Sequence, residues 1–85
     1  MEIYVKVLYF AAAREARGVR EERVTLPPGS TTEELVKALE LACPALKPVL
    51  RTSVLAINEV YLEGTAPQAL KSGDEVAVIP PISGG

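Results

Sequence analysis

Few side chains in this 85-residue chain offer chemistry, because it contains one cysteine and no histidine. Histidine is the usual general acid or base near neutral pH and a common zinc ligand, so neither role is available here. The cysteine, Cys43, continues the helical stripe of Leu35 and Leu39 and lies at a predicted helix C-terminus. A reactive thiol needs exposure and a cationic or helix N-terminal setting. We therefore expect Cys43 to be a small buried residue of the core.

The charged residues offer no better catalytic centre. Glu21 and Glu22 are neighbours in a predicted strand, so their side chains should point to opposite faces, and helix capping explains Glu33 and Glu34. The glycines match no phosphate-binding loop. Four arginines gather around the first connection, where either a solvated basic edge or a docking site would explain them: Arg14, Arg17, Arg20 and Arg23.

The last six residues, Pro-Pro-Ile-Ser-Gly-Gly, have an unusual composition. Pro80 and Pro81 cannot continue a strand ladder and favour an extended exit from the last strand. Gly84 and Gly85 have no side chain, so their backbone can enter a narrow channel and present a terminal carboxylate. From the residues alone, an inert, frayed end explains this segment equally well.

Composition limits the classes of function that we expect. Nine basic and eleven acidic residues give a net charge of −2, and the aromatic residues are three tyrosines and one phenylalanine. Nucleic-acid binding is therefore not expected. No apolar run reaches the ~18 residues of a transmembrane helix, and the first residues lack the pattern of a signal peptide. We expect a cytoplasmic protein without a membrane partner.

The hydrophobic pattern predicts strands at residues 3–10, 20–26, 54–57, 60–62 and 75–79. Residues 11–18 are typical of a short helix that ends at Gly18. The main helix begins at two overlapping capping boxes, which pair Ser30 with Glu33 and Thr31 with Glu34, and it ends at Pro44. Residues 45–51 predict a weaker helical turn, interrupted by a proline at position 48.

One amphipathic helix cannot bury its apolar stripe alone, so it must pack on a sheet. The first and last strands are the longest β-rich runs, and we expect them to pair in parallel at the centre of that sheet. The pattern predicts an α+β fold of the β-grasp (ubiquitin-like) type, with a mixed four- to five-stranded sheet on one main helix. Residues 1–80 would form this domain, and residues 81–85 a flexible, extended Gly-Gly tail.

Strand alternation also predicts an exposed apolar surface. Leu8 and Phe10 should lie opposite the core face of the first strand, and Ile79 opposite the core face of the last strand. Phe10 and Ile79 would then share the outer surface beside the exit of the tail. Exposed apolar clusters on a small domain usually mark an interface.

Two segments resemble the small subunit of molybdopterin synthase, the MoaD family. They are residues 7–15, Val-Leu-Tyr-Phe-Ala-Ala-Ala-Arg-Glu, and residues 70–85, Leu-Lys-Ser-Gly-Asp-Glu-Val-Ala-Val-Ile-Pro-Pro-Ile-Ser-Gly-Gly. Gly-Asp-Glu-Val followed by a strand, Pro-Pro and a final Gly-Gly is a specific combination, and the resemblance spans the whole chain. The family has a β-grasp fold, in agreement with the pattern above.

The resemblance implies a sulfur carrier that is not an enzyme on its own but the sulfur-donating subunit of a transferase complex. In the family, ATP is used to adenylate the terminal glycine, here Gly85, and sulfur from a persulfide replaces AMP to give a thiocarboxylate. The tail inserts into the large subunit and donates sulfur to cyclic pyranopterin monophosphate, which forms the dithiolene of molybdopterin. The inserted residues would be Pro80, Pro81, Ile82, Ser83, Gly84 and Gly85. No permanently bound cofactor or metal is implied.

The resemblance also implies three partners: the large synthase subunit (MoaE-type) in a heterotetramer, an E1-like adenylyltransferase (MoeB-type), and a sulfurtransferase or cysteine desulfurase. Phe10, Leu62 and Ile79 would contact the partners. The chain departs from the family pattern at Ile79, where some relatives have an aromatic residue, and around Asn58. Three alternatives remain: a thiamine-pathway carrier (ThiS-like), a ubiquitin-like modifier that joins lysines through Gly85, and an interaction domain with an inert tail.

Overall fold

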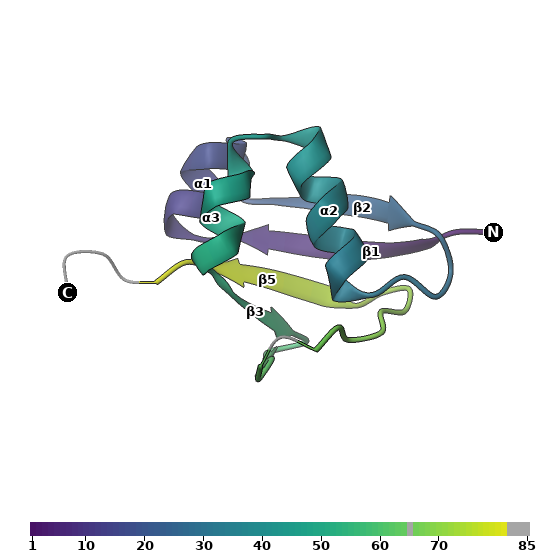
Figure 1. The fold of residues 1–85 in the computed structure, drawn as a ribbon. Helices are drawn as coiled ribbons and strands as arrows, with labels where there is room; N and C mark the ends of the chain where they lie inside the picture. The colour runs from purple at the N-terminus through teal and green to yellow at the C-terminus, as the bar shows by residue number, and fades with distance from the viewer. Residues whose placement is uncertain (65, 82–85) are drawn as a thin grey trace.

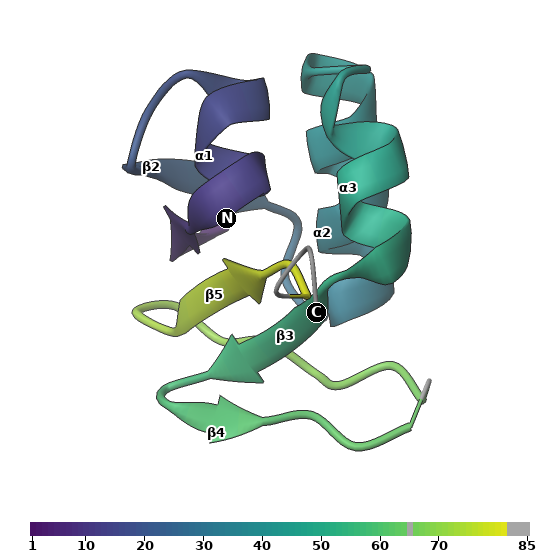
Figure 2. The same cartoon turned by 90° about the vertical axis from the view of Figure 1, so that its left-hand side faces the viewer.

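The structure, a computed structural model, describes residues 1–64 and 66–81. Within them the elements are β1 (Ile3–Tyr9), α1 (Ala11–Arg17), β2 (Glu21–Leu26), α2 (Thr32–Ala42), α3 (Leu46–Thr52), β3 (Val54–Ile57), β4 (Val60–Tyr61) and β5 (Glu75–Ile79). The strands form one sheet in the order β2-β1-β5-β3-β4. All three helices lie on the same face of this sheet (Figures 1 and 2).

The centre of the sheet is the parallel pair of β1 and β5, in which Val7 lies opposite Val76 and Tyr9 opposite Val78. The other neighbouring strands pair antiparallel. A parallel pair needs a long crossover connection, and the helices provide it on one face. The predicted β-grasp arrangement, with the first and last strands side by side, is confirmed.

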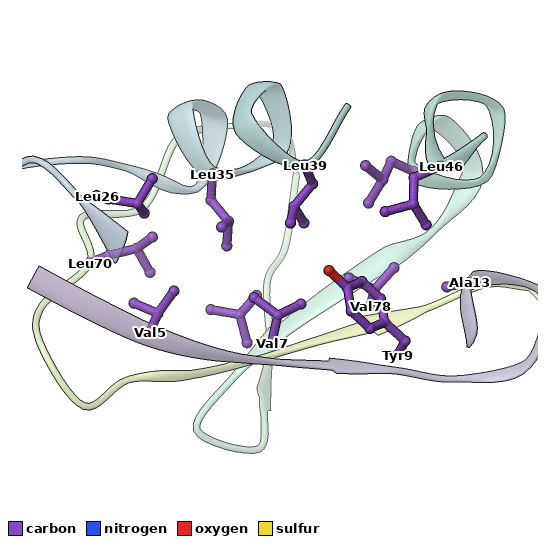
Figure 3. Close-up of a cluster of buried hydrophobic side chains, with 12 residues drawn as sticks. Val5, Val7, Tyr9, Ala13, Leu26, Leu35, Leu39, Leu46, Leu70 and Val78 are labelled. Carbon is purple, nitrogen blue, oxygen red and sulfur yellow. The ribbon is translucent and has the colours of Figure 1, made fainter. Parts of the chain in front are cut away.

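The core lies between the sheet and the helices, and Figure 3 shows its side chains pointing toward one another from both layers. Alternate residues of β1 and β5 meet the apolar stripe of α2 and the first turn of α3; the central members are Val5, Val7, Tyr9, Val76, Val78, Leu35, Leu39 and Leu46. Full burial of one such aliphatic side chain contributes about 1.5–3 kcal/mol. Because strand side chains alternate, burial of this set leaves their neighbours on the outer face.

The helix α2 is the longest of the three, as predicted, but α3 is more regular than the sequence indicated and packs against both α1 and α2. From its sequence, this segment was predicted to be interrupted at Pro48. Pro48 instead occupies the third helical position, after Leu46 and Lys47. The first turn of a helix has no intrahelical acceptor for its N–H groups, so a proline there removes no hydrogen bond.

Only one of the two predicted capping boxes forms at the start of α2. The Thr31 backbone N–H donates to Glu34 Oε1 at 2.8 Å, and the Thr31 side chain accepts the reciprocal bond. The Ser30 hydroxyl donates instead to the Pro27 carbonyl at 2.7 Å. The Ser30 carbonyl also accepts the Leu70 N–H, so Ser30 belongs to the connection before the helix.

Candidate functional site

The outer face of the sheet, away from the helices, carries an open apolar groove. Phe10 and Tyr61 stand at its sides and are 47% and 62% exposed. The other residues along the groove are Leu8, Ala56, Glu59, Glu75, Ala77 and Ile79. Its volume of about 290 Å³ is at the low end of the ~300–1,000 Å³ of small-molecule sites. An exposed apolar surface of this kind fits a protein partner better than a small ligand.

The groove follows directly from the strand registers. Leu8 of β1 lies opposite Ala77 of β5, Ala77 lies opposite Ala56 of β3, and Ala56 lies opposite Tyr61 of β4. The two small alanines are therefore at the centre, between larger side chains on either side. A hollow results without any loss of packing on the core face.

Phe10 owes its exposed position to the junction between β1 and α1. Its N–H donates to the Val78 carbonyl at 3.3 Å, and its carbonyl accepts the Ala13 N–H at 3.0 Å. The next residue, Ala11, has a φ of +49°, a left-handed conformation that costs a non-glycine residue about 1–2 kcal/mol. The chain thus turns into the helix at a strained residue directly beside the groove.

The tail leaves the sheet next to Phe10. β5 is the central strand, and its last residue, Ile79, pairs with Val54 at the start of β3. Pro80 is partly buried and Pro81 is exposed. The structure therefore brings together Phe10, Ile79 and the base of the tail, as the strand alternation predicted. The remaining predicted tail residues, Ile82, Ser83, Gly84 and Gly85, lie outside the described residues.

Leu62, the third predicted contact, does not lie in this groove. Its N–H donates to the Leu55 carbonyl at 2.9 Å. The Leu55 side chain packs against the core, so Leu62 pairs with a residue of the core face. Leu62 is half-buried and lines a second hollow, of about 600 Å³, between α2, α3 and β3. Tyr61, and not Leu62, lines the outer groove. The two-residue turn Asn58-Glu59 was the signal that would have found Tyr61, because such a turn fixes which residues lie opposite each other.

A polar cluster on the core side of the sheet was also missed by sequence reasoning. The Tyr9 hydroxyl donates to Glu22 Oε2, and Arg17 forms a forked pair with the same carboxylate at 2.7 and 2.9 Å. The Arg17 guanidinium holds the pKa of Glu22 below its usual range. Burial and the Glu22 carboxylate raise the pKa of Tyr9. The cluster therefore keeps Glu22 charged and Tyr9 protonated.

The arginines predicted to gather around the first connection separate in the structure. Arg17 belongs to the cluster with Glu22, and the Arg23 guanidinium lies over the Tyr4 ring at 4.6 Å from its centroid. Arg14 and Arg20 are exposed. A solvated basic edge therefore does not describe all four arginines, because Arg17 and Arg23 have specific partners.

The other side chains with chemical potential have structural contacts. Cys43 is half-buried against the core, and its thiol lies 3.6 Å from the Ala16 carbonyl. The buried carboxylate of Asp74 accepts hydrogen bonds from the Lys71 N–H and from Asn58 Nδ2. In the part of the chain that the structure describes, no group of three or more histidine, cysteine or acidic residues could hold a metal ion. No helix there is long and apolar enough to cross a membrane.

Comparison with known sequences finds matches along nearly the whole chain. Residues 7–85 match the ThiS family. The molybdopterin synthase sulfur carrier subunit of Chlamydomonas reinhardtii is 49% identical over 95% of this chain and 98% of its own length. The carrier subunit of the same name from Arabidopsis thaliana is 45% identical over 98% of this chain and 84% of its own.

Solved structures share the fold at similar coverage. A candidate subunit 1 of molybdopterin converting factor from Pyrococcus furiosus matches with a TM-score of 0.82, at 32% identity over 94% of this chain and 99% of that one. Small archaeal modifier protein 1 from Haloferax volcanii matches with a TM-score of 0.83, at 29% identity over 96% and 99%. A complex of subunits 1 and 2 of molybdopterin-converting factor from Helicobacter pylori matches at 0.62, with 26% identity over 98% and 100%.

Proposed function

Because this chain belongs to the ThiS family, and within it to the sulfur carrier subunits of molybdopterin synthase, we propose that it carries sulfur on its final glycine for the synthesis of molybdopterin. The observation that carries the proposal is the identity to curated carriers over nearly their full length. The shared fold and the groove beside the tail agree with it.

The proposed chemistry is covalent group transfer on a tether. A carboxylate is a poor acceptor for sulfur until one of its oxygens becomes part of a good leaving group. An E1-like enzyme supplies that leaving group when the Gly85 carboxylate attacks ATP and pyrophosphate departs, which leaves a glycyl adenylate. Sulfur from a persulfide then displaces AMP to give an acyl disulfide. A thiol attacks the donor's sulfur of this S–S bond, which releases the thiocarboxylate and leaves a disulfide between that thiol and the donor. This route asks the carrier to provide only its tail, because the other reactants come from its partners.

The outer groove is the proposed docking surface for the large synthase subunit. The complex of subunits 1 and 2 from Helicobacter pylori supports a partner of this kind. Phe10 and Ile79 flank the base of the tail, so a partner that covers the groove would also lie beside the tail. Glu59 and Glu75 add acidic groups to the groove, which favours a partner surface with basic groups around an apolar centre.

Reconstitution tests the proposal directly. The carrier, the adenylyltransferase, ATP, a sulfur donor, the large subunit and cyclic pyranopterin monophosphate should together form molybdopterin. Deletion of Gly85 should abolish product formation, because the acceptor carboxylate is then displaced along the tail. Product formation by the Gly85 deletion at the wild-type rate would contradict the proposal. Omission of the large subunit provides the second control.

A protein-modifier function is the second candidate, because small archaeal modifier protein 1 matches this chain with a TM-score of 0.83. In that case, the activated Gly85 would form isopeptide bonds with lysines of other proteins. The two functions differ in their products when the chain is added to cell extract with ATP. Discrete binding to one large subunit favours the synthase, whereas a ladder of high-mass conjugates favours the modifier.

A further inference from the structure

Tyr9, Glu22 and Arg17 link three elements on the face of the sheet opposite the groove. Tyr9 comes from β1, Glu22 from β2 and Arg17 from the last turn of α1. Tyr9 is 2% exposed, and both ring and hydroxyl lie inside the core layer (Figure 3). The forked Arg17–Glu22 pair and the Tyr9 hydroxyl meet on one carboxylate. The cluster therefore fastens the end of α1 to both strands beneath it.

α1 depends on such a fastening. It has seven residues, and no side chain caps its N-terminus. Isolated helices of this length are unstable in water, so tertiary contacts must hold α1 in place. Its first residue, Ala11, adds a left-handed backbone conformation that relaxes if the helix is released. The fully buried Ala13 anchors the start of α1, and Arg17 anchors its end.

The position of α1 in turn sets the position of Phe10. The Phe10 carbonyl accepts hydrogen bonds from the N–H groups of Ala13 and Arg14, which belong to the first turn of α1. Its N–H donates to Val78 of the central strand. Phe10 thus connects a strand of the sheet to the helix. A displacement of α1 would break these hydrogen bonds to the Phe10 carbonyl and free the backbone at Phe10 and Ala11.

We propose that Tyr9, Glu22 and Arg17 are positioning residues for partner docking: they hold α1 and, through the strained junction at Ala11, keep Phe10 at the groove before the partner arrives. Their side chains do not line the groove, so they act through Phe10. The inference rests on the proposed function, because it takes the groove as the docking surface of the large subunit. Preorganisation of this kind raises affinity without a new contact.

The single phenylalanine of the chain makes the test specific. Carrier labelled with fluorophenylalanine has one fluorine resonance, which reports on Phe10 alone. The test variants are Glu22→Gln, which is nearly isosteric, and Arg17→Met, which keeps the unbranched side chain without the guanidinium; neither adds a phenylalanine. Glu33→Gln is the control for charge, since Glu33 pairs with Lys37 on the exposed face of α2. Leu39→Ala is the control for stability, since Leu39 is a buried residue of α2.

Affinity for the large subunit and the fluorine spectrum of the free carrier are measured well below the melting temperature of each variant. If Glu22→Gln leaves Phe10 in place in one molecule in ten, its Kd should rise about tenfold. Its fluorine resonance should broaden or split in the free carrier. Arg17→Met should show the same changes, since it removes the two hydrogen bonds that join the end of α1 to Glu22. Both controls should keep the wild-type affinity and one narrow resonance.

An unchanged affinity of Glu22→Gln would overturn the inference, and so would an unchanged fluorine resonance. If Glu22→Gln does not fold, Arg17→Met decides by the same two measurements. Failure of the wild-type carrier to bind the large subunit would instead overturn the proposed function. In that case, the fluorine spectrum still tests whether the cluster holds Phe10.

Discussion

At the scale of single residues, the polar groups of this domain serve mainly to connect segments. Asp74 joins the turn before β5 to the turn after β3, because its carboxylate accepts hydrogen bonds from Lys71 and Asn58. Glu22 joins α1 to the sheet in the same manner. The hydrogen bonds from Arg17 and Tyr9 favour the charged form of Glu22, so the connection through Glu22 depends on pH.

Glu22→Gln should lower the free energy of unfolding at neutral pH by about 1.5–3 kcal/mol, the usual contribution of a hydrogen bond to a charged group. Because folding lowers the pKa of Glu22, its stabilisation is complete above the unfolded-chain pKa of about 4.3. It is lost as the pH falls through the lower pKa of the folded protein. Denaturant unfolding between pH 7 and pH 2 checks this: the difference between wild type and Glu22→Gln should shrink at acid pH. An undiminished difference at pH 2 would contradict the role of the charge.

Gly84→Ala tests the width of the path that the tail takes in the partner. One added methyl group restricts the backbone and occupies space in a channel built for glycine. Sulfur transfer in the reconstituted synthase should therefore fall by at least tenfold, which corresponds to about 1.4 kcal/mol. The melting temperature should not change, because Val78 is the last core residue in the part of the chain that the structure describes. Equal transfer rates for Gly84→Ala and wild type would show that the partner has no narrow channel.

At the scale of elements, the pattern predicted the sheet better than its connections. β1 and β5 could be predicted as central partners because both are rich in strand-forming residues. In both strands, buried residues alternate with more exposed ones. The helix α3 was predicted only as a weak helical turn, because a proline inside a helix is unfavourable. Pro48 is tolerated because it lies in the first turn of α3, and the sequence alone does not show where that turn begins. The side of the sheet on which Leu62 lies depends on the register between β3 and β4. The two-residue turn sets this register, and amino-acid composition does not reveal it.

The turn between β3 and β4 contains a residue in an unfavourable conformation. Asn58 and Glu59 have φ values of +50° and +72°, and a two-residue turn of this kind prefers Asn-Gly. Glu59→Gly should therefore stabilise the domain by up to about 1 kcal/mol, because the left-handed conformation costs a residue with a side chain ~1–2 kcal/mol, whereas glycine adds an entropic cost of roughly 0.5–1 kcal/mol. Since 1 kcal/mol shifts the melting temperature by about 4–8 °C in a domain of this size, calorimetry can detect the gain. Glu63→Gly, at a residue without a positive φ, should give no gain; an equal gain there would refute the strain at Glu59.

At the scale of the whole molecule, one layer of helices covers one face of the sheet, and the other face remains open (Figure 2). The central strand leads from the core directly into the tail, so the proposed docking surface lies beside the residues where the tail begins. Residues of ordinary apolar type form the groove, and only the strand alternation distinguishes them from the core. Phe10 and Ile79 could therefore be predicted from strand alternation alone. Tyr61 could be assigned to the groove only with the register between β3 and β4.

Phe10→Glu should separate docking from folding. Phe10 is 47% exposed, so a charge there leaves the core intact and the melting temperature close to that of the wild type. A buried aromatic contact at the centre of an interface is commonly worth 2 kcal/mol or more, so affinity for the large subunit should fall about 30-fold. Leu41→Glu is the matched control, because Leu41 is 85% exposed on the helix layer. Equal losses of affinity in both variants would show that the groove is not the docking surface.

The central claim, that this chain carries sulfur on its final glycine, is tested most directly by the intact mass of the chain after incubation with the adenylyltransferase, ATP and a sulfur donor. The account predicts an increase equal to the exchange of one oxygen atom for one sulfur atom, located at Gly85 by fragmentation. Cys43→Ala should show the same increase, because the thiol is packed against the core. An unchanged mass, or sulfur located on Cys43 instead of Gly85, would contradict the account.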